Sequence, residues 1–126
     1  MSFSSALGSY SISGKIQNAT INCKTVQTCT FSLYLFNANP TASTFTDTNA
    51  AAINAADINK VCGVIASGTA SSALGTHTTW NISNITQEFV SATAGLQTIY
   101  GVLIVTGTPT FTSTSDLTIN LTVLQD

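Results

Sequence analysis

Charge is the scarcest property of this 126-residue sequence. It contains three Lys, no Arg, five acidic residues and one His, so only 6% of its residues are charged, where a soluble domain carries about 25%. Nucleic-acid binding needs clustered Lys and Arg to neutralise phosphates, so the composition excludes that class of function. The chain also lacks the run of ~18 apolar residues that a membrane helix needs, and positions 1–13 carry no basic residue typical of a secretory signal. We therefore expect a protein made in a cytoplasm, with no nucleic-acid and no membrane partner.

Patterns typical of enzymes and metal sites are missing as well. The three cysteines form no C-x-x-C pair, and His77 is not accompanied by a G-x-S-x-G nucleophile motif. The acidic side chains show no pairing that would suit glycoside hydrolysis. We predict no enzymatic activity, no metal and no other cofactor. Two alternatives exist for Cys23 and Cys29. A hairpin could bring them together as a disulfide, or they could be buried free thiols.

Thr, Ser and Asn stand where charged residues are usual, and they alternate with Ile, Val, Leu and Phe. Alternation with a period of two predicts half-buried β-strands. We assign strands on this basis to 10–16, 29–36, 61–66, 78–82 and 117–123, with a short one through Ile21 and Cys23. The continuous apolar run at 98–106 predicts a central strand that is buried on both faces.

One segment departs from the β pattern. Ala-rich residues follow Asp47 and Thr48, both of which are suitable helix N-caps, and predict one short helix within 48–59. Strands 8 to 15 residues apart with one helical insertion are typical of a β-sandwich. The prediction is therefore an all-β chain: an N-terminal arm at 1–9, then a single β-sandwich domain of jelly-roll type at 10–126.

The aromatic residues allow two interpretations. Trp80, Tyr34 and Tyr100 could form an exposed platform for sugars, as in a carbohydrate-binding module that contacts a host surface. Alternatively, they could pack in the core of the sandwich, where large aromatic side chains are common. An exposed Trp80 would favour the first interpretation.

Two parts of the chain resemble a known class of proteins. The first part contains STFTD at 43–47, AD at 56–57 and KVCGVI at 60–65. The second contains IYGVLIV at 99–105, GTPTF at 107–111 and the terminal DLTINLTVLQD at 116–126. Together they resemble small structural proteins of tailed bacteriophages that decorate, or cement, the icosahedral head. The resemblance implies a homo-oligomer, with a trimer favoured, that sits on the outer surface of the capsid and binds the major capsid protein.

Four apolar residues are candidates for oligomer or capsid contacts. Phe3 and Leu7 lie in the Ser-rich arm, which is too polar to fold alone, and Ile53 and Ile58 lie in the expected helical insertion. The insertion could also do no more than cover one end of the sandwich. Besides head decoration, the sequence leaves open a tail, collar or head-fibre component.

Overall fold

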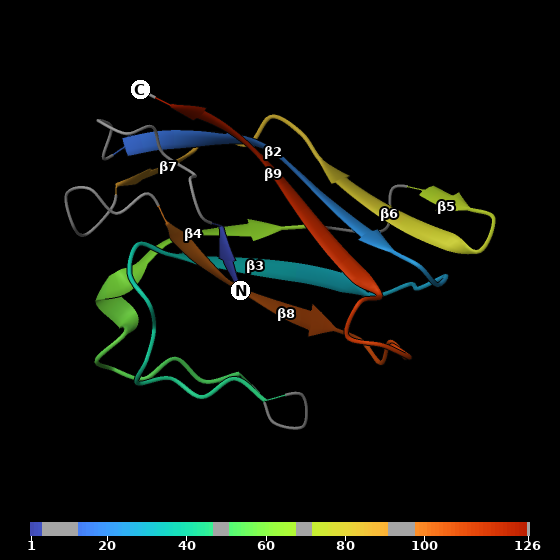
Figure 1. Cartoon of the computed structure of the whole chain (residues 1–126), viewed down its shortest axis with the longest axis horizontal. Coiled ribbons are helices and arrows are strands. Elements are labelled where there is room, and N and C mark those ends of the chain that lie inside the picture. The colour runs from blue at the N-terminus through green and yellow to red at the C-terminus, as the bar shows by residue number, and fades with distance from the viewer. Residues whose placement is uncertain (4–12, 47–50, 68–71, 91–97, 126) are drawn as a thin grey trace.

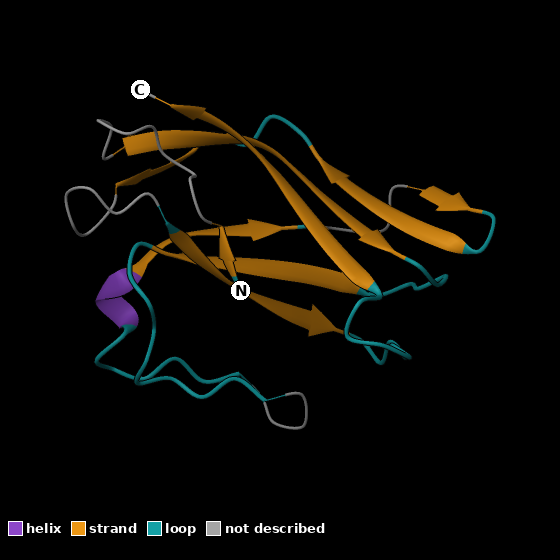
Figure 2. Ribbon diagram, in the orientation of Figure 1, coloured by secondary structure: helices purple, strands orange, loops and turns teal. Residues whose placement is uncertain are grey.

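Strands make up nearly all of the regular structure. The computed structural model describes residues 1–3, 13–46, 51–67, 72–90 and 98–125. Two antiparallel sheets pack against each other, one above the other in Figure 1, and one short helix lies at the side (Figure 2). The prediction of an all-β sandwich is confirmed, while the jelly-roll subtype stays a prediction.

Sheet B is organised around β2 (Ser13–Cys23). The strand β9 (Leu117–Gln125) pairs along one edge of β2, while β6 (His77–Ile82) and β7 (Gln87–Val90) share the other edge. The strand β5 (Ser72–Leu74) adds to β6. The register shifts between Ile16 and Asn18 of β2, which indicates a bulge opposite β9. The predicted strand at 10–16, of which 10–12 lie outside the described residues, and the short one through Ile21 and Cys23 are therefore one long strand, and β7 was not predicted.

Sheet A has the order β1, β8, β3, β4. Its two inner strands are β8 (Ile99–Thr106) and β3 (Thr30–Phe36), and its edges are β4 (Val61–Ala66) and the two-residue β1 (Ser2–Phe3). The bounds of β3, β4 and β8 agree with the predicted strands to within a residue. The N-terminal amine of Met1 donates to the carbonyl oxygen of Gly101 at 2.9 Å, so the first residues are attached to β8.

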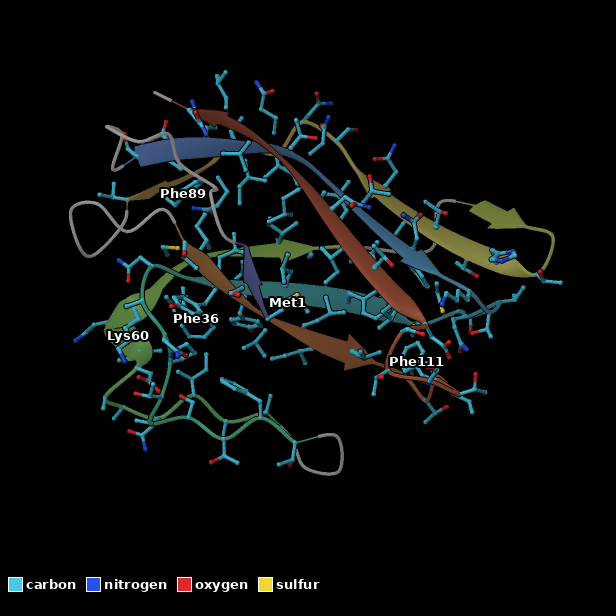
Figure 3. The ribbon with its side chains drawn as sticks, viewed as in Figure 1. Met1, Phe36, Lys60, Phe89 and Phe111 are labelled. Atoms are coloured by element: carbon cyan, nitrogen blue, oxygen red, sulfur yellow. The ribbon has the colours of Figure 1, made fainter. Side chains whose placement is uncertain are left out.

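The core lies between the sheets and follows the period-two pattern of the strands. Inward-facing residues of β2 and β3 are almost completely buried, and Phe89 of β7 lies between the sheets in Figure 3. The buried apolar residues of this core are Ile16, Ala19, Ile21, Cys23, Cys29, Phe31, Leu33, Leu35, Ile65, Trp80, Phe89 and Ile99. Alternation of polar and apolar residues along the strands therefore supplies the core between the two sheets, although the chain has few charged residues.

The helical insertion is much shorter than predicted. Among the described residues 51–60, the only helix is a 3-10 turn at Ile58–Lys60, and residues 51–57 form no helix. Ala52 instead forms an antiparallel bridge with Thr44. A helix of about a dozen residues is marginal in water unless tertiary contacts support it. Here the tertiary contacts of Asp57, described below, favour the extended path.

Strand β8 also differs from its prediction. Its residues 102–105 are half-buried rather than buried on both faces. Strand β1 pairs with Ile99 and Tyr100 at one end of β8, and no other described strand pairs along that edge of β8. No helix in the described residues is long and apolar enough to cross a membrane.

Candidate assembly surface

The segment 37–60, which we call the excursion, connects β3 to β4 across the outside of sheet A. Figure 1 shows it on the side of sheet A that faces away from sheet B. Phe45 packs against Phe36 with ring centroids 6.3 Å apart and an interplanar angle of 61°. This contact covers the outward side chain of Phe36, which is fully buried although it lies on the outer face of β3. The excursion is therefore a third layer over one end of sheet A.

A buried carboxylate fixes the path of the excursion. Asp57 is 0% exposed, and its Oδ2 accepts hydrogen bonds from the Ala42 N–H at 2.9 Å and the Ser43 hydroxyl at 2.7 Å. Its Oδ1 pairs with Lys60 Nζ at 2.6 Å, and the same ammonium donates to the Asn39 carbonyl oxygen at 2.9 Å. One carboxylate and one ammonium thus tie residues 39–43 to residues 57–60, near the two ends of the excursion.

The electrostatics of this cluster favour the ionised carboxylate. The hydrogen bond from Lys60 lowers the pKa of Asp57 most strongly, and the Ser43 hydrogen bonds and the Lys60 charge lower it further. Burial opposes this by disfavouring the charge, and the pKa stays below its ordinary value. A buried charge that is fully paired and hydrogen-bonded is costly to disrupt, because losing one partner leaves the other uncompensated. The cluster therefore fixes residues 39–43 against residues 57–60.

The four predicted contact residues have different placements. Ile58, beside Asp57 in the 3-10 turn, is 54% exposed, while Ile53 is half-buried. Phe3 lies in β1, where its backbone pairs with Ile99, and its side chain is outside what is described. Leu7 lies outside the described residues. The structure thus brings Ile58 to the surface on the excursion, and the contact roles of all four residues remain predictions.

Apolar side chains that were not predicted as contacts lie on the outer face of sheet A. Val64, Tyr34 and Val102 are direct cross-strand neighbours on β4, β3 and β8, and Ile104 lies one step along β8 on the same face. Val64 is 46% exposed, and the other three are half-buried. We call these four residues the sheet A patch. The alternation in 29–36 had already placed Tyr34 on the face opposite Leu33, but the neighbours on β4 and β8 depend on the strand order.

The outer face of sheet B is polar in its middle and mixed at the end that carries Lys15. At that end Lys15 pairs with Glu88 at 3.0 Å, and the nearby Leu124 and Val90 are 51% and 52% exposed. The other cross-strand rows consist of hydroxyl and amide side chains, because the outward positions of β9, β2 and β6 alternate with the buried ones. The rows are Thr118, Asn22 and Thr79, then Asn120, Thr20 and Asn81, then Thr122 and Asn18. Exposed apolar side chains thus occur on both outer faces, and the sheet A patch differs in joining neighbouring apolar residues of three strands with no charged group among them.

The sugar-platform interpretation of the aromatic residues fails on burial. Trp80 is 0% exposed, its ring packs edge-on against Phe31 at 4.7 Å, and its Nε1 donates to the Cys29 carbonyl oxygen at 3.1 Å. It points into the core from sheet B, whereas Tyr34 and Tyr100 lie on the outer face of sheet A. The three rings therefore share no surface.

The remaining polar groups have local structural roles. Asp116 Oδ2 accepts hydrogen bonds from the Thr112 N–H and hydroxyl and from the Ser113 N–H, and the pKa of Asp116 is lowered mainly by the Thr112 N–H. His77 is exposed, and its Nδ1 lies 3.0 Å from the Thr76 hydroxyl. In the described ranges no three His, Cys, Asp or Glu side chains gather as metal ligands would.

The three cysteines are free thiols in the structure, so the disulfide alternative for Cys23 and Cys29 is not realised. Cys23 Sγ lies 3.3 Å from the Thr25 hydroxyl, and burial raises the pKa of the Cys29 and Cys62 thiols. Comparison of the chain with protein-family models, with curated proteins and with solved structures finds no match.

Proposed function

We propose that this chain is a non-enzymatic structural subunit of a tailed-phage head, which binds the outside of the capsid and stabilises the shell. In this proposal it is a homo-oligomer, with a trimer favoured, and its partner is the major capsid protein. It is made in the host cytoplasm and ends on the outer surface of the virion. The observation that carries the proposal is the sheet A patch, where neighbouring apolar side chains of three strands are partly exposed and no charged residue lies among them.

The physical basis is the cost of burying a surface. Charged groups are depleted in the cores of protein interfaces, because their desolvation is costly unless they are paired. The sheet A patch has no charge, and beside it the excursion presents Ile58 on a segment fixed by the Asp57 cluster. A rigid apolar surface loses little conformational entropy on binding, which favours affinity.

An oligomer would bind the capsid through several copies of the same modest contact and would therefore dissociate slowly. Once one subunit of an oligomer is bound, the contacts of the others become intramolecular, and the combined affinity exceeds that of a single contact. The low basic charge of the chain fits a position on the outside of the shell, away from the packaged genome.

The test is binding of the purified chain to empty, expanded heads of the phage that encodes it. We expect saturable binding with many copies per particle, and density on the outer surface in an electron-microscopy map. Val64→Lys should weaken this binding at least tenfold, because it places a charge in the sheet A patch. Asn18→Lys is the matched control, since it adds the same charge at an exposed position on the opposite face.

Two outcomes would contradict the proposal. A few copies per particle located at the tail, collar or a head fibre would place the chain elsewhere in the virion. Equal binding by both lysine variants, or loss of binding in Asn18→Lys alone, would show that the sheet A patch is not the contact surface.

A further inference from the structure

On one side of the sandwich, two strand edges have no partner along most of their length among the described strands. The strand β9 pairs with β2 along one edge only, and no described strand pairs with its other edge. On the same side, β8 has no described partner beyond Gly101 along the edge that faces away from β3. Contacts between β4 and β7 place the other edges of the two sheets together, so β8 and β9 border the remaining side.

The inward side chains along this side are less covered than the rest of the core. Ile119, Leu121 and Val123 of β9 are half-buried, whereas their cross-strand partners on β2, which are Ile21, Ala19 and Ile16, are at most 1% exposed. Leu103 and Val105 of β8 also pack against the core and are half-buried. We call these five residues of β8 and β9 the open side. The inward side chains of β9 are thus more exposed than those of β2 beside it.

The open side lacks the features that normally protect an edge strand. Neither β9 nor β8 contains a charged residue or a proline, and the bulge of the β2–β9 pair lies on β2. Soluble proteins usually guard long edges with Lys, Pro, bulges or short strands. The edge of β4, by contrast, is partly covered, because Gln87 Nε2 donates to the Cys62 carbonyl oxygen at 2.8 Å. An unguarded edge of nine residues is a template for pairing with another chain.

The charge pattern identifies the best partner as a second copy of this chain. A partner with charged groups would have to bury them against apolar and uncharged residues without pairing, whereas a copy brings the same uncharged edges. The strand also matches itself: antiparallel pairing centred on Leu121 sets Ile119 opposite Val123 and Asn120 opposite Thr122. In these central pairs apolar residues face apolar ones and polar residues face polar ones, whereas the outer pairs, Thr118 with Leu124 and Leu117 with Gln125, are mixed.

We infer that the open side, with the β9 edge at its centre, is where copies of this chain associate. The inference specifies the self-association part of the proposed function and does not depend on the capsid. Pairing of β9 with β9 of a second copy gives a two-fold dimer, whereas docking of β9 against β8 of the next copy allows a closed ring such as a trimer. In either case the half-buried residues of the open side become the core of the interface.

The first measurement uses the unmodified chain without capsids. Sedimentation across a wide concentration range should show a dimer or a trimer that dissociates on dilution. Amide hydrogen exchange in the peptide 117–125 should slow as the oligomer forms, whereas β2, which is paired on both edges, should be protected at all concentrations. A monomer at every concentration, or an oligomer in which 117–125 shows no added protection, would overturn the inference.

The second measurement compares two lysine variants. Leu121→Lys places a charge in the open side and should raise the dissociation constant roughly 30-fold or more. Asn18→Lys, the control, should leave it unchanged. Circular dichroism and the urea midpoint establish that each variant is folded, and if Leu121→Lys is not, Val105→Lys tests the same surface from β8. A folded Leu121→Lys or Val105→Lys variant that oligomerises like the unmodified chain would refute the inference.

Capsid binding is scored separately, so the two proposals can fail separately. A monomeric Leu121→Lys variant that still binds heads, with weaker retention, supports both. A chain that oligomerises through 117–125 but does not bind heads would overturn the proposed function and leave the open side intact.

Discussion

Replacement of Trp80 by Phe should destabilise the fold and change no surface. The indole is fully buried, contacts Phe31 edge-on and donates to the carbonyl oxygen of Cys29. Phenylalanine keeps an aromatic ring in the core, but it removes the only donor of this side chain and leaves a gap where the larger ring system was. The change therefore separates a core role for Trp80 from a ligand-binding role.

The magnitude follows from two losses. Removing the Nε1–H takes a partner from a buried carbonyl group, which costs about 1–3 kcal/mol. The smaller ring leaves a cavity that the neighbours fill only in part, which adds about 1–2 kcal/mol. A total of about 2–5 kcal/mol is a large fraction of the stability of a domain this size, and at about 4 °C per kcal/mol it lowers Tm by roughly 10 °C or more.

The assay is urea unfolding followed by far-UV circular dichroism, since the variant has no tryptophan to report on the transition. Tyr34→Phe is the control, because Tyr34 lies half-buried on the outer face, and we expect a change within about 0.5 kcal/mol. In the unmodified chain, acrylamide should quench the single tryptophan poorly. A Trp80→Phe variant as stable as the unmodified chain, or a readily quenched indole, would refute the burial of this residue and reopen the sugar-platform interpretation.

Three further predictions concern the polar cluster, a close strand contact and the thiols. Asp57 has a folded-state pKa below its unfolded value of about 3.9. The stability that its ionised form contributes is therefore complete above that value and is lost as the pH falls through the folded pKa. Asp57→Asn should lower the urea midpoint at pH 7 and make the fall of that midpoint below pH 4 less steep. A Cβ on Gly63 would overlap the Gln87 side chain, so Gly63→Ala should cost about 1–3 kcal/mol in urea unfolding, and much less when Gln87→Ala is added; equal costs in both backgrounds would contradict the contact. Alkylation of the denatured chain without reductant should label all three cysteines by mass spectrometry, and in the folded chain the half-buried Cys62 should react first; a doubly protected species would indicate a disulfide.

The strands could be predicted from the sequence because their pattern is local. Alternation in 29–36 and 117–123 states which residues face inward, and the structure confirms it in β3 and β9. The short β7 carried no such signal, because four residues with one charge give too little alternation to recognise.

The excursion could not be predicted, because its conformation depends on distant partners. Alanine content favoured a helix in 48–59, yet the side chain of Asp57 finds donors at Ala42, Ser43 and Lys60 only when the chain passes close to all of them. Tertiary contacts of this kind override local propensity. The sheet A patch was hidden for the same reason, since Val64 and Val102 become neighbours of Tyr34 only through the strand order.

The central position of β2 has a consequence for folding during synthesis on the ribosome. Strand β2 is synthesised well before β9, the strand that pairs along its length. The nascent chain therefore carries Ile16 and Ile21 without their final neighbours until β9 has been synthesised. Contacts between the two ends of a chain close slowly, because the loop-closure entropy is lost before the contacts form. We expect sheet B to be completed only once β9 has been synthesised, and subunit association to wait for the same event, because the strand that completes sheet B is also the strand at the open side.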